Sequence, residues 1–339
     1  MKSSMKLAAV WAVAVTVIGV ALAIGLNPNP AEGIALLGLG GMMVNNATLT
    51  TLAQGFNAAF LRGFGTVAPS WNQVAMEIPS TSDAENYGWM KDLPGMREWV
   101  GQRVYNNLES AGAQLRNKTW EHTIAVKRDH IEDDKLGIYS NLFSIQGEIV
   151  ARHPDDLVWG LLAQGFATKG FDGQFFFDSD HLSHNRAGVE TSWSNTQGGS
   201  GAPWFLMDLS RAFMKPLILQ NRRKPAFVPR TNPADPHVFD LNEFVFGADA
   251  RYNAGFGFHQ LAVGSKLTLD ATNYEGARTS LASQFRPDGS PLGVRATHLI
   301  VGTSNEAKAR ALLEKERLAN GEDNIWHRTA QLIVSPWLE

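Results

Sequence analysis

The spacing of apolar residues changes in the middle of the chain, and this change limits the folds that the sequence can adopt. Between residues 119 and 127 apolar and polar residues alternate, and one face carries Trp120, His122, Ile124 and Val126. Such alternation is typical of a half-buried β-strand. After Leu136 the spacing becomes helical, with apolar residues at Leu142, Ile145 and Ile149. The chain is therefore expected to contain both strands and helices, and the strand, helix, strand order in its C-terminal part favours an α+β fold.

Pro154 interrupts the helical pattern, which resumes at Leu157 and Leu161. Proline has no backbone N–H to donate within a helix. The sequence therefore predicts that the helix breaks or kinks at this residue. Asp155 and Asp156 would then lie in the first turn of the second helix, where the helix dipole favours carboxylates.

An amphipathic helix is expected over residues 46–61, with Gly63 and Gly65 ending it. The segment before it is different, because residues 7–26 carry no charge and follow Lys2 and Lys6. Twenty such residues are enough to span a hydrocarbon core of about 30 Å. A signal peptide with cleavage after Ala23 fits the same residues.

The C-terminal part has clear local signals. Asp270 is placed to cap a helix that extends to about Gln284, and residues 297–301 and 331–334 read as short strands. Between these strands, the run from Thr303 to Glu306 has the pattern of a capping box. The helix that it starts is expected to reach Leu318 and to end at Asn320-Gly321.

Residues 165–203 are rich in Gly, Ser, Asn and Asp, and they read as loops with one short strand at 174–177. Within them Asp178, Asp180 and His181, with His184 nearby, form a weak candidate metal site, because carboxylates and imidazoles are metal ligands. A solvated, turn-forming loop explains the same residues, and we favour that interpretation. We therefore predict no metal and no cofactor.

Two charged runs allow several interpretations. Arg222-Arg223-Lys224 before Pro225 is compatible with phosphate binding, with a solvated turn, or with ion pairs across a subunit interface. The turn is favoured because three charges are few for a nucleic-acid site. The acids of Glu132-Asp133-Asp134 are adjacent to one another and favour helix capping over acid–base catalysis.

Composition excludes some classes of protein. The 339 residues include no cysteine, so disulfides and thiolate metal sites are excluded, and the net charge of −3 does not indicate a DNA-reading surface. No nucleophile elbow, P-loop, zinc-protease or dinucleotide-binding motif occurs. These observations weigh against an enzyme.

An ordered series of motifs over most of the chain resembles one protein family. In chain order the motifs are Trp71-Asn72, Met76, Tyr87-Gly88-Trp89, Arg97-Glu98-Trp99-Val100-Gly101, Arg128-Asp129, Glu132-Asp133-Asp134, Gly137-Ile138-Tyr139, His153-Pro154-Asp155-Asp156-Leu157, residues 171–178, Gln220-Asn221-Arg222-Arg223-Lys224-Pro225, residues 242–248 and residues 254–258. Together they resemble the T-type major head subunit of Mu-like bacteriophages. The resemblance implies the Hong Kong 97 capsid fold.

The family fold implies an order of regions along the chain. Residues 43–69 would form the N-terminal arm, 70–128 the E-loop region, 129–205 the P domain with its spine helix, and 206–339 the A domain with a return to the P domain. Residues 1–42 lie outside the resemblance. We interpret them as sequence upstream of a start at Met43; a signal peptide, a membrane segment and an added arm are the alternatives.

The resemblance implies a structural protein. Such a subunit forms homo-pentamers and homo-hexamers of an icosahedral shell around double-stranded DNA, together with scaffold, protease and portal proteins, and it assembles in the bacterial cytoplasm without a membrane. Candidate interface residues are Arg97, Arg103, Asp133, Asp134, Arg222 and Arg223. The alternatives are an encapsulin-like compartment protein and an exported or membrane-anchored hydrolase with the acidic-histidine site.

Overall fold

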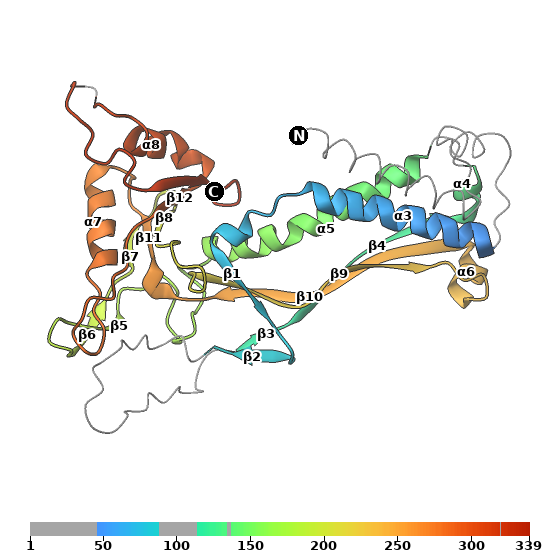
Figure 1. The fold of residues 1–339 in the computed structure, drawn as a ribbon, viewed down its shortest axis with the longest axis horizontal. Coiled ribbons are helices and arrows are strands. Elements are labelled where there is room, and N and C mark those ends of the chain that lie inside the picture. The colour runs from blue at the N-terminus through green and yellow to red at the C-terminus, as the bar shows by residue number, and fades with distance from the viewer. Residues whose placement is uncertain (1–45, 88–113, 134–136, 319) are drawn as a thin grey trace, which may run out of the picture. The chain divides into compact units, whose positions relative to one another are not determined.

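The computed structural model describes residues 46–87, 114–133, 137–318 and 320–339, and these form two compact units (Figure 1). Unit 1 contains residues up to 61, 123–145 and 229–247, and unit 2 contains 62–122, 146–228 and 248–339. Helices and strands are mixed throughout, as expected for an α+β fold. Within the described residues, no helix is both long enough and apolar enough to cross a membrane. The apolar run 7–26 lies outside them.

A four-stranded sheet has the order β1-β9-β10-β4. Its strands are β1 (Ala75–Pro79), β9 (Leu217–Arg230), β10 (Glu243–Phe256) and β4 (Lys118–Lys127). Strand β1 runs parallel to β9, with Ala75 opposite Leu217 and Pro79 opposite Asn221. In β4 every second side chain from Trp120 to Val126 is shielded, so the predicted alternation is confirmed. The short helix α4 (Arg128–Glu132) directly follows β4, and the short helix α6 (Pro236–Leu241) directly precedes β10.

Three aromatic rings form the centre of unit 1. Phe56 belongs to helix α3 (Asn46–Thr66), Phe143 to helix α5 (Ile138–Ala163), and Phe246 to β10. The ring centroids lie 4.4 Å apart for Phe56 and Phe143, 4.9 Å for Phe143 and Phe246, and 5.2 Å for Phe56 and Phe246. Edge-to-face and tilted rings at such distances are a favourable arrangement.

Helix α3 passes through both glycines that were expected to end it, so that prediction is wrong. One glycine lowers helix stability by only about 1 kcal/mol. Burial of a side chain such as Phe60 contributes about 1.5–3 kcal/mol. The hydroxyl of Thr66 also donates to the Gly63 carbonyl oxygen in the last turn.

Helix α5 is continuous through Pro154, so of the predicted break or kink the break does not occur. Proline leaves one carbonyl of the preceding turn without its helical partner. The turns after it are fixed by the fully buried side chains of Val158, Trp159 and Leu162. Packing therefore outweighs the lost hydrogen bond.

Asp155 consequently lies inside a helix and not at a helix start. Its carboxylate accepts hydrogen bonds from the Ser70 amide (2.9 Å), the Ser70 hydroxyl (2.9 Å) and the Trp71 amide (2.6 Å). It thereby holds the start of the 3-10 turn η1 (Trp71–Gln73). The aspartate caps a turn that precedes it by many residues, a role that no local pattern encodes.

A five-stranded sheet with the order β13-β12-β8-β11-β7 lies in unit 2. Its strands are β7 (Thr196–Gly199), β8 (Trp204–Met207), β11 (Ala262–Lys266), β12 (His298–Val301) and β13 (Gln331–Val334). Helices α7 (Ala271–Ala282) and α8 (Thr303–Leu313) pack against it (Figure 1). The predicted strands β12 and β13 are confirmed, and so is the Asp270 cap, which accepts from the Asn273 amide at 2.8 Å.

The predicted capping box at the start of α8 is wrong. Gly302 is the N-cap residue, the Thr303 hydroxyl donates to the Glu339 carboxylate, and Glu306 pairs with Arg310 at 2.8 Å. The helix also ends at Leu313, before the expected Leu318. Later residues explain this early end, because the Arg328 amide donates to the Leu313 carbonyl oxygen at 2.9 Å.

Two small sheets complete the described structure. Strands β2 (Ala84–Asn86) and β3 (Gln114–Arg116) pair antiparallel within the region expected to form the E-loop; residues 88–113 between them lie outside the described part. Strands β5 (His181–His184) and β6 (Glu190–Trp193) form a hairpin. The strand predicted at 174–177 is absent there: Phe175 makes only one bridge with Lys169, and the neighbours Phe176 and Phe177 are both buried, which breaks the alternation.

Candidate functional site

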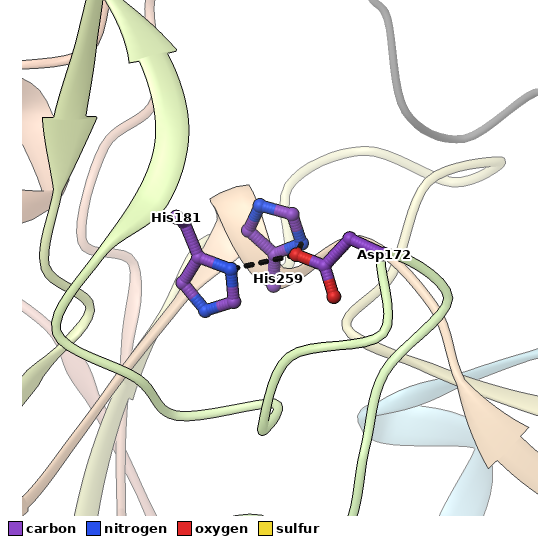
Figure 2. A group of neighbouring side chains, drawn as sticks. All are labelled: Asp172, His181 and His259. Atoms are coloured by element: carbon purple, nitrogen blue, oxygen red, sulfur yellow. Dashed lines mark hydrogen bonds and ion pairs between the residues drawn. The ribbon is translucent and has the colours of Figure 1, made fainter.

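Two histidines and one aspartate form a buried polar cluster in unit 2 (Figure 2). His181 begins β5, His259 begins the 3-10 turn η3 (His259–Leu261), and Asp172 lies in the loop between α5 and β5. His181 Nδ1 lies 2.7 Å from Asp172 Oδ2, and His259 Nδ1 lies 3.7 Å from the same oxygen. The two imidazole rings stack with centroids 4.0 Å apart and planes 12° apart.

Burial controls the protonation of His259 in this cluster. Burial, with a smaller contribution from neighbouring His181, lowers the pKa of His259 from 6.5 to about 3, against the attraction of Asp172. His259 is therefore neutral at neutral pH. Burial alone would raise the pKa of Asp172, but the hydrogen bond from His181 and the two nearby imidazoles keep it below its usual value.

The donor set of one carboxylate and two imidazoles is one that Zn²⁺ accepts. The geometry is that of a direct hydrogen bond, because the carboxylate oxygen and His181 Nδ1 are in contact at 2.7 Å. The parallel stacking of the rings also differs from two imidazoles that converge on one ion. We therefore interpret the cluster as a structural link between the loop, β5 and η3. A cavity of about 150 Å³ adjoins it, and Asp172, His184 and His259 contribute to its lining.

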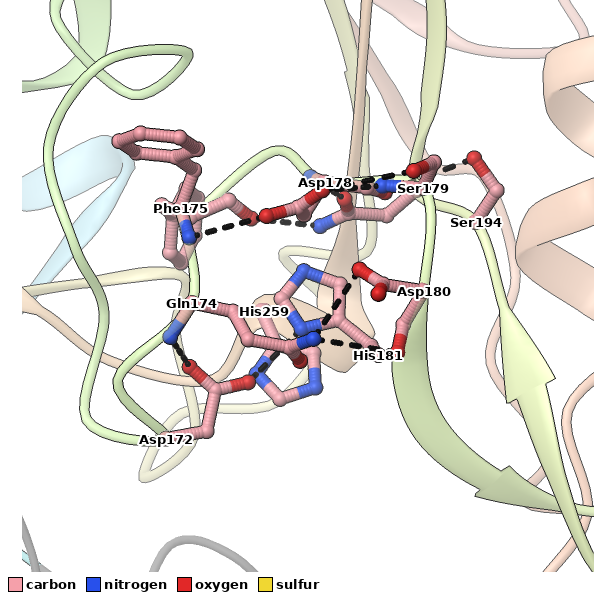
Figure 3. A network of polar contacts seen from close by, with 11 residues as sticks. Asp172, Gln174, Phe175, Asp178, Ser179, Asp180, His181, Ser194 and His259 are labelled. Atoms are coloured by element: carbon pink, nitrogen blue, oxygen red, sulfur yellow. Dashed lines mark hydrogen bonds and ion pairs between the residues drawn. The ribbon is translucent and has the colours of Figure 1, made fainter.

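The metal candidates from the sequence are only partly brought together (Figure 3). Asp178 accepts from the amides of Phe175 (3.2 Å) and Ser179 (2.7 Å), and Asp180 Oδ1 accepts from the Gln174 side chain at 3.0 Å. Both aspartates organise the loop, and of the three candidates only His181 belongs to the buried cluster.

Sequence reasoning missed Asp172 and His259 as members of this cluster. Asp172 stands in the quoted motif 171–178, and His259 directly follows the motif 254–258. The sequence motifs therefore pointed to the two segments that carry these residues. Their mutual contact depends on tertiary folding, which spacing along the chain does not encode.

The candidate interface residues are dispersed. Arg223 forms an ion pair with Asp249 on β10, and Arg222 is exposed without an ion pair to any described residue. Asp133 is the C-cap residue of α4. Arg97, Arg103 and Asp134 lie outside the described residues.

The basic run Arg222-Arg223-Lys224 lies inside β9, so the predicted turn is wrong. Strand β1 pairs with β9 only as far as Asn221, whose carbonyl oxygen accepts from the Ser80 amide at 3.0 Å. Alternate residues of a strand direct their backbone groups to the same side. Pro225 and Pro229 therefore face the side that β1 leaves uncovered among the described residues, where they remove N–H donors from an exposed edge.

Comparisons with known proteins agree on one family. The model of the family described as "Mu-like prophage major head subunit gpT" matches residues 49–338. The chain is 38% identical to the major capsid protein of Escherichia phage Mu, with 88% of the chain and 100% of that protein covered. It is 34% identical to the Mu-like prophage FluMu major head subunit of Haemophilus influenzae, with 84% and 96% covered.

Solved structures give the same result. A chain from the procapsid of bacteriophage JBD30 has a TM-score of 0.77 and 39% identity, with 87% of this chain and 100% of that chain covered. A chain from the JBD30 capsid has a TM-score of 0.69 and 30% identity. The fold is that of Hong Kong 97-like capsid proteins, and neither the compartment protein nor the hydrolase is supported. This chain belongs to the Mu-like major head subunit family and is a structural protein, not an enzyme.

Proposed function

We propose that the chain is the major capsid protein of a Mu-like phage or prophage, and that it assembles into pentamers and hexamers of an icosahedral shell around double-stranded DNA. One observation carries the proposal: a family match over residues 49–338, together with likeness to a procapsid chain along that chain's whole length. The proposal places the protein in the virion.

We propose the following regions within this subunit. Residues 43–69 act as the N-terminal arm, 70–128 as the E-loop region, 129–205 as the P domain, and 206–339 as the A domain with a return to the P domain. The β2–β3 pair supports the second assignment, and the long helix α5 supports the third. Helices α7 and α8 against their sheet support the fourth.

The proposed partners follow from the family resemblance. Scaffold, protease and portal proteins would act with the subunit during assembly in the bacterial cytoplasm, and DNA would be enclosed without sequence preference. The net charge of −3 is compatible with enclosure, since tight binding to phosphates would hinder packaging and release.

Electron microscopy and sedimentation of the purified full chain test the proposal. We expect closed shells or ring-shaped capsomers, with the scaffold protein added if the chain alone stops at capsomers. A monodisperse monomer at high concentration in the presence of scaffold would contradict it.

A further inference from the structure

Three arginines surround one open groove in unit 2, at the end of the five-stranded sheet. The groove has a volume of about 680 Å³, and its charged lining consists of Arg278, Arg295, Arg328 and the single acid Glu275. None of the three arginines forms an ion pair with a described residue. The chain as a whole has more acids than bases, 33 against 30, so the groove reverses the charge balance of the molecule.

The positive groups are held in place by the fold. The Arg278 guanidinium donates to the Tyr274 hydroxyl and to the Thr329 carbonyl oxygen, both at 3.1 Å. It also lies 5.5 Å from the Tyr274 ring centroid and 5.9 Å from that of Trp326. Its charge is therefore oriented before any ligand arrives, which lowers the entropy lost on binding.

The backbone around the other two arginines is fixed as well. Arg328 has a φ of 56°, an uncommon conformation for a residue other than glycine, and its amide donates to the Leu313 carbonyl oxygen at 2.9 Å. Such conformations persist only where surrounding contacts impose them. The Arg295 amide donates to Asp208 Oδ2 at 3.1 Å. Three like charges thus line one groove, one of them with its guanidinium oriented and the other two on a fixed backbone, an arrangement that an anionic partner would stabilise.

We propose that this groove, built around Arg278, Arg295 and Arg328, binds carboxylates of a second copy of the chain in the shell. The inference rests on the proposed function, because assembly brings many copies into contact. The positive lining is arginine without lysine and includes Trp326. Arginine and tryptophan are enriched at protein–protein interfaces, whereas lysine is depleted. The planar guanidinium also matches a carboxylate in a two-point contact.

A crosslinking experiment identifies the occupant. The native chain has no cysteine, so Thr279→Cys at the groove gives one attachment point for a benzophenone maleimide. Irradiated shells should yield crosslinked dimers, and mass spectrometry should find a peptide with Asp or Glu from a second copy. Thr191→Cys on β6 is the matched control for attachment at an exposed threonine. Crosslinks confined to one chain, or no crosslinks from position 279 in assembled shells, would overturn the proposal.

Charge reversal tests the energetics. Arg295→Glu combined with Arg328→Glu should lower shell yield by at least about tenfold, since the loss at each contact is multiplied over a shell. Arg295→Lys with Arg328→Lys should retain most of the yield. Arg186→Glu with Lys308→Glu, also exposed and also changing two charges, should have little effect.

The remaining outcomes separate the two proposals. If the unsubstituted chain forms no shells or capsomers, the proposed function fails. A different outcome is that the unsubstituted chain forms shells while the groove variants also form them normally but lose affinity for short duplex DNA. In that case the groove is a nucleic-acid site, and the inference that it binds a second copy is wrong. Equal losses of yield in the groove and control variants also contradict it.

Discussion

The two units bury their apolar side chains to different extents. Both large clusters of buried side chains lie wholly in unit 2, where Trp204, Phe205, Leu206 and Met207 of β8 are each fully buried. Unit 1 has its three tilted and edge-to-face rings at the centre, and it exposes Leu61, Ile138, Ile145, Phe239 and Leu241; the much larger unit 2 also exposes apolar side chains such as Phe213. Unit 2 therefore has the larger core, and in the small unit 1 exposed apolar side chains make up more of the surface that another molecule could cover.

The largest effect is expected from the core of unit 2. Phe205→Ala removes a fully buried ring, and large aromatic deletions of this kind cost about 3–5 kcal/mol. Urea unfolding of dispersed subunits, followed by tryptophan fluorescence, measures the loss. A cost below about 1 kcal/mol would show that the core of unit 2 tolerates a large cavity.

A smaller loss is expected when the cap on η1 is removed. Asp155→Ala leaves two amides and one hydroxyl near Ser70 without their acceptor, which costs about 2–3 kcal/mol. Asp155→Asn is the matched control, because it keeps the shape and one acceptor oxygen and should lose less. If both variants unfold like the unsubstituted protein, the carboxylate does not stabilise unit 2.

The histidine cluster predicts a pH dependence of stability in unit 2. The pKa of His259 is about 3 in the folded protein and 6.5 as its ordinary value, so the unfolded chain binds more protons between these values. The stability that neutral His259 contributes is fully present above pH 6.5. It is lost as the pH falls, and the loss reaches about 2 kcal/mol at pH 5. Unfolding curves at pH 7 and pH 5 measure the loss. His259→Gln should flatten this dependence, and an equal dependence in the variant would contradict the assignment.

The smallest change in stability is expected in unit 1. Phe239 is 81% exposed, so Phe239→Ser should change the unfolding free energy by less than about 0.5 kcal/mol. Shell yield should nevertheless fall, because an interface would lose the apolar cover that this ring provides. Normal yield with unchanged stability would mean that the exposed side chains of unit 1 have no part in assembly.

Local signals predicted the elements that depend on near neighbours. The alternation of β4, the Asp270 cap of α7 and the short strands β12 and β13 were readable from adjacent residues. The errors at Thr303 and at the end of α8 share a cause, since residues distant in the sequence supply the deciding contacts.

Contacts between distant segments also build the histidine cluster and the arginine groove, so local sequence patterns could not predict either site in full. His181 was identifiable as a polar residue in an acidic loop, but its partner His259 comes from another part of the chain. The arginines of the groove also come from three separate segments. The family itself was recognisable because its motifs keep their order over most of the chain.

Pro225 and Pro229 on the open side of β9 have a consequence for the subunit before assembly. An exposed strand with a full set of donors and acceptors is a template for pairing with a second copy of the same strand. Removing donors at alternate positions of that side leaves only part of the ladder that such stacking requires. An edge interrupted in this way is a poor template for pairing with a second copy of the same strand.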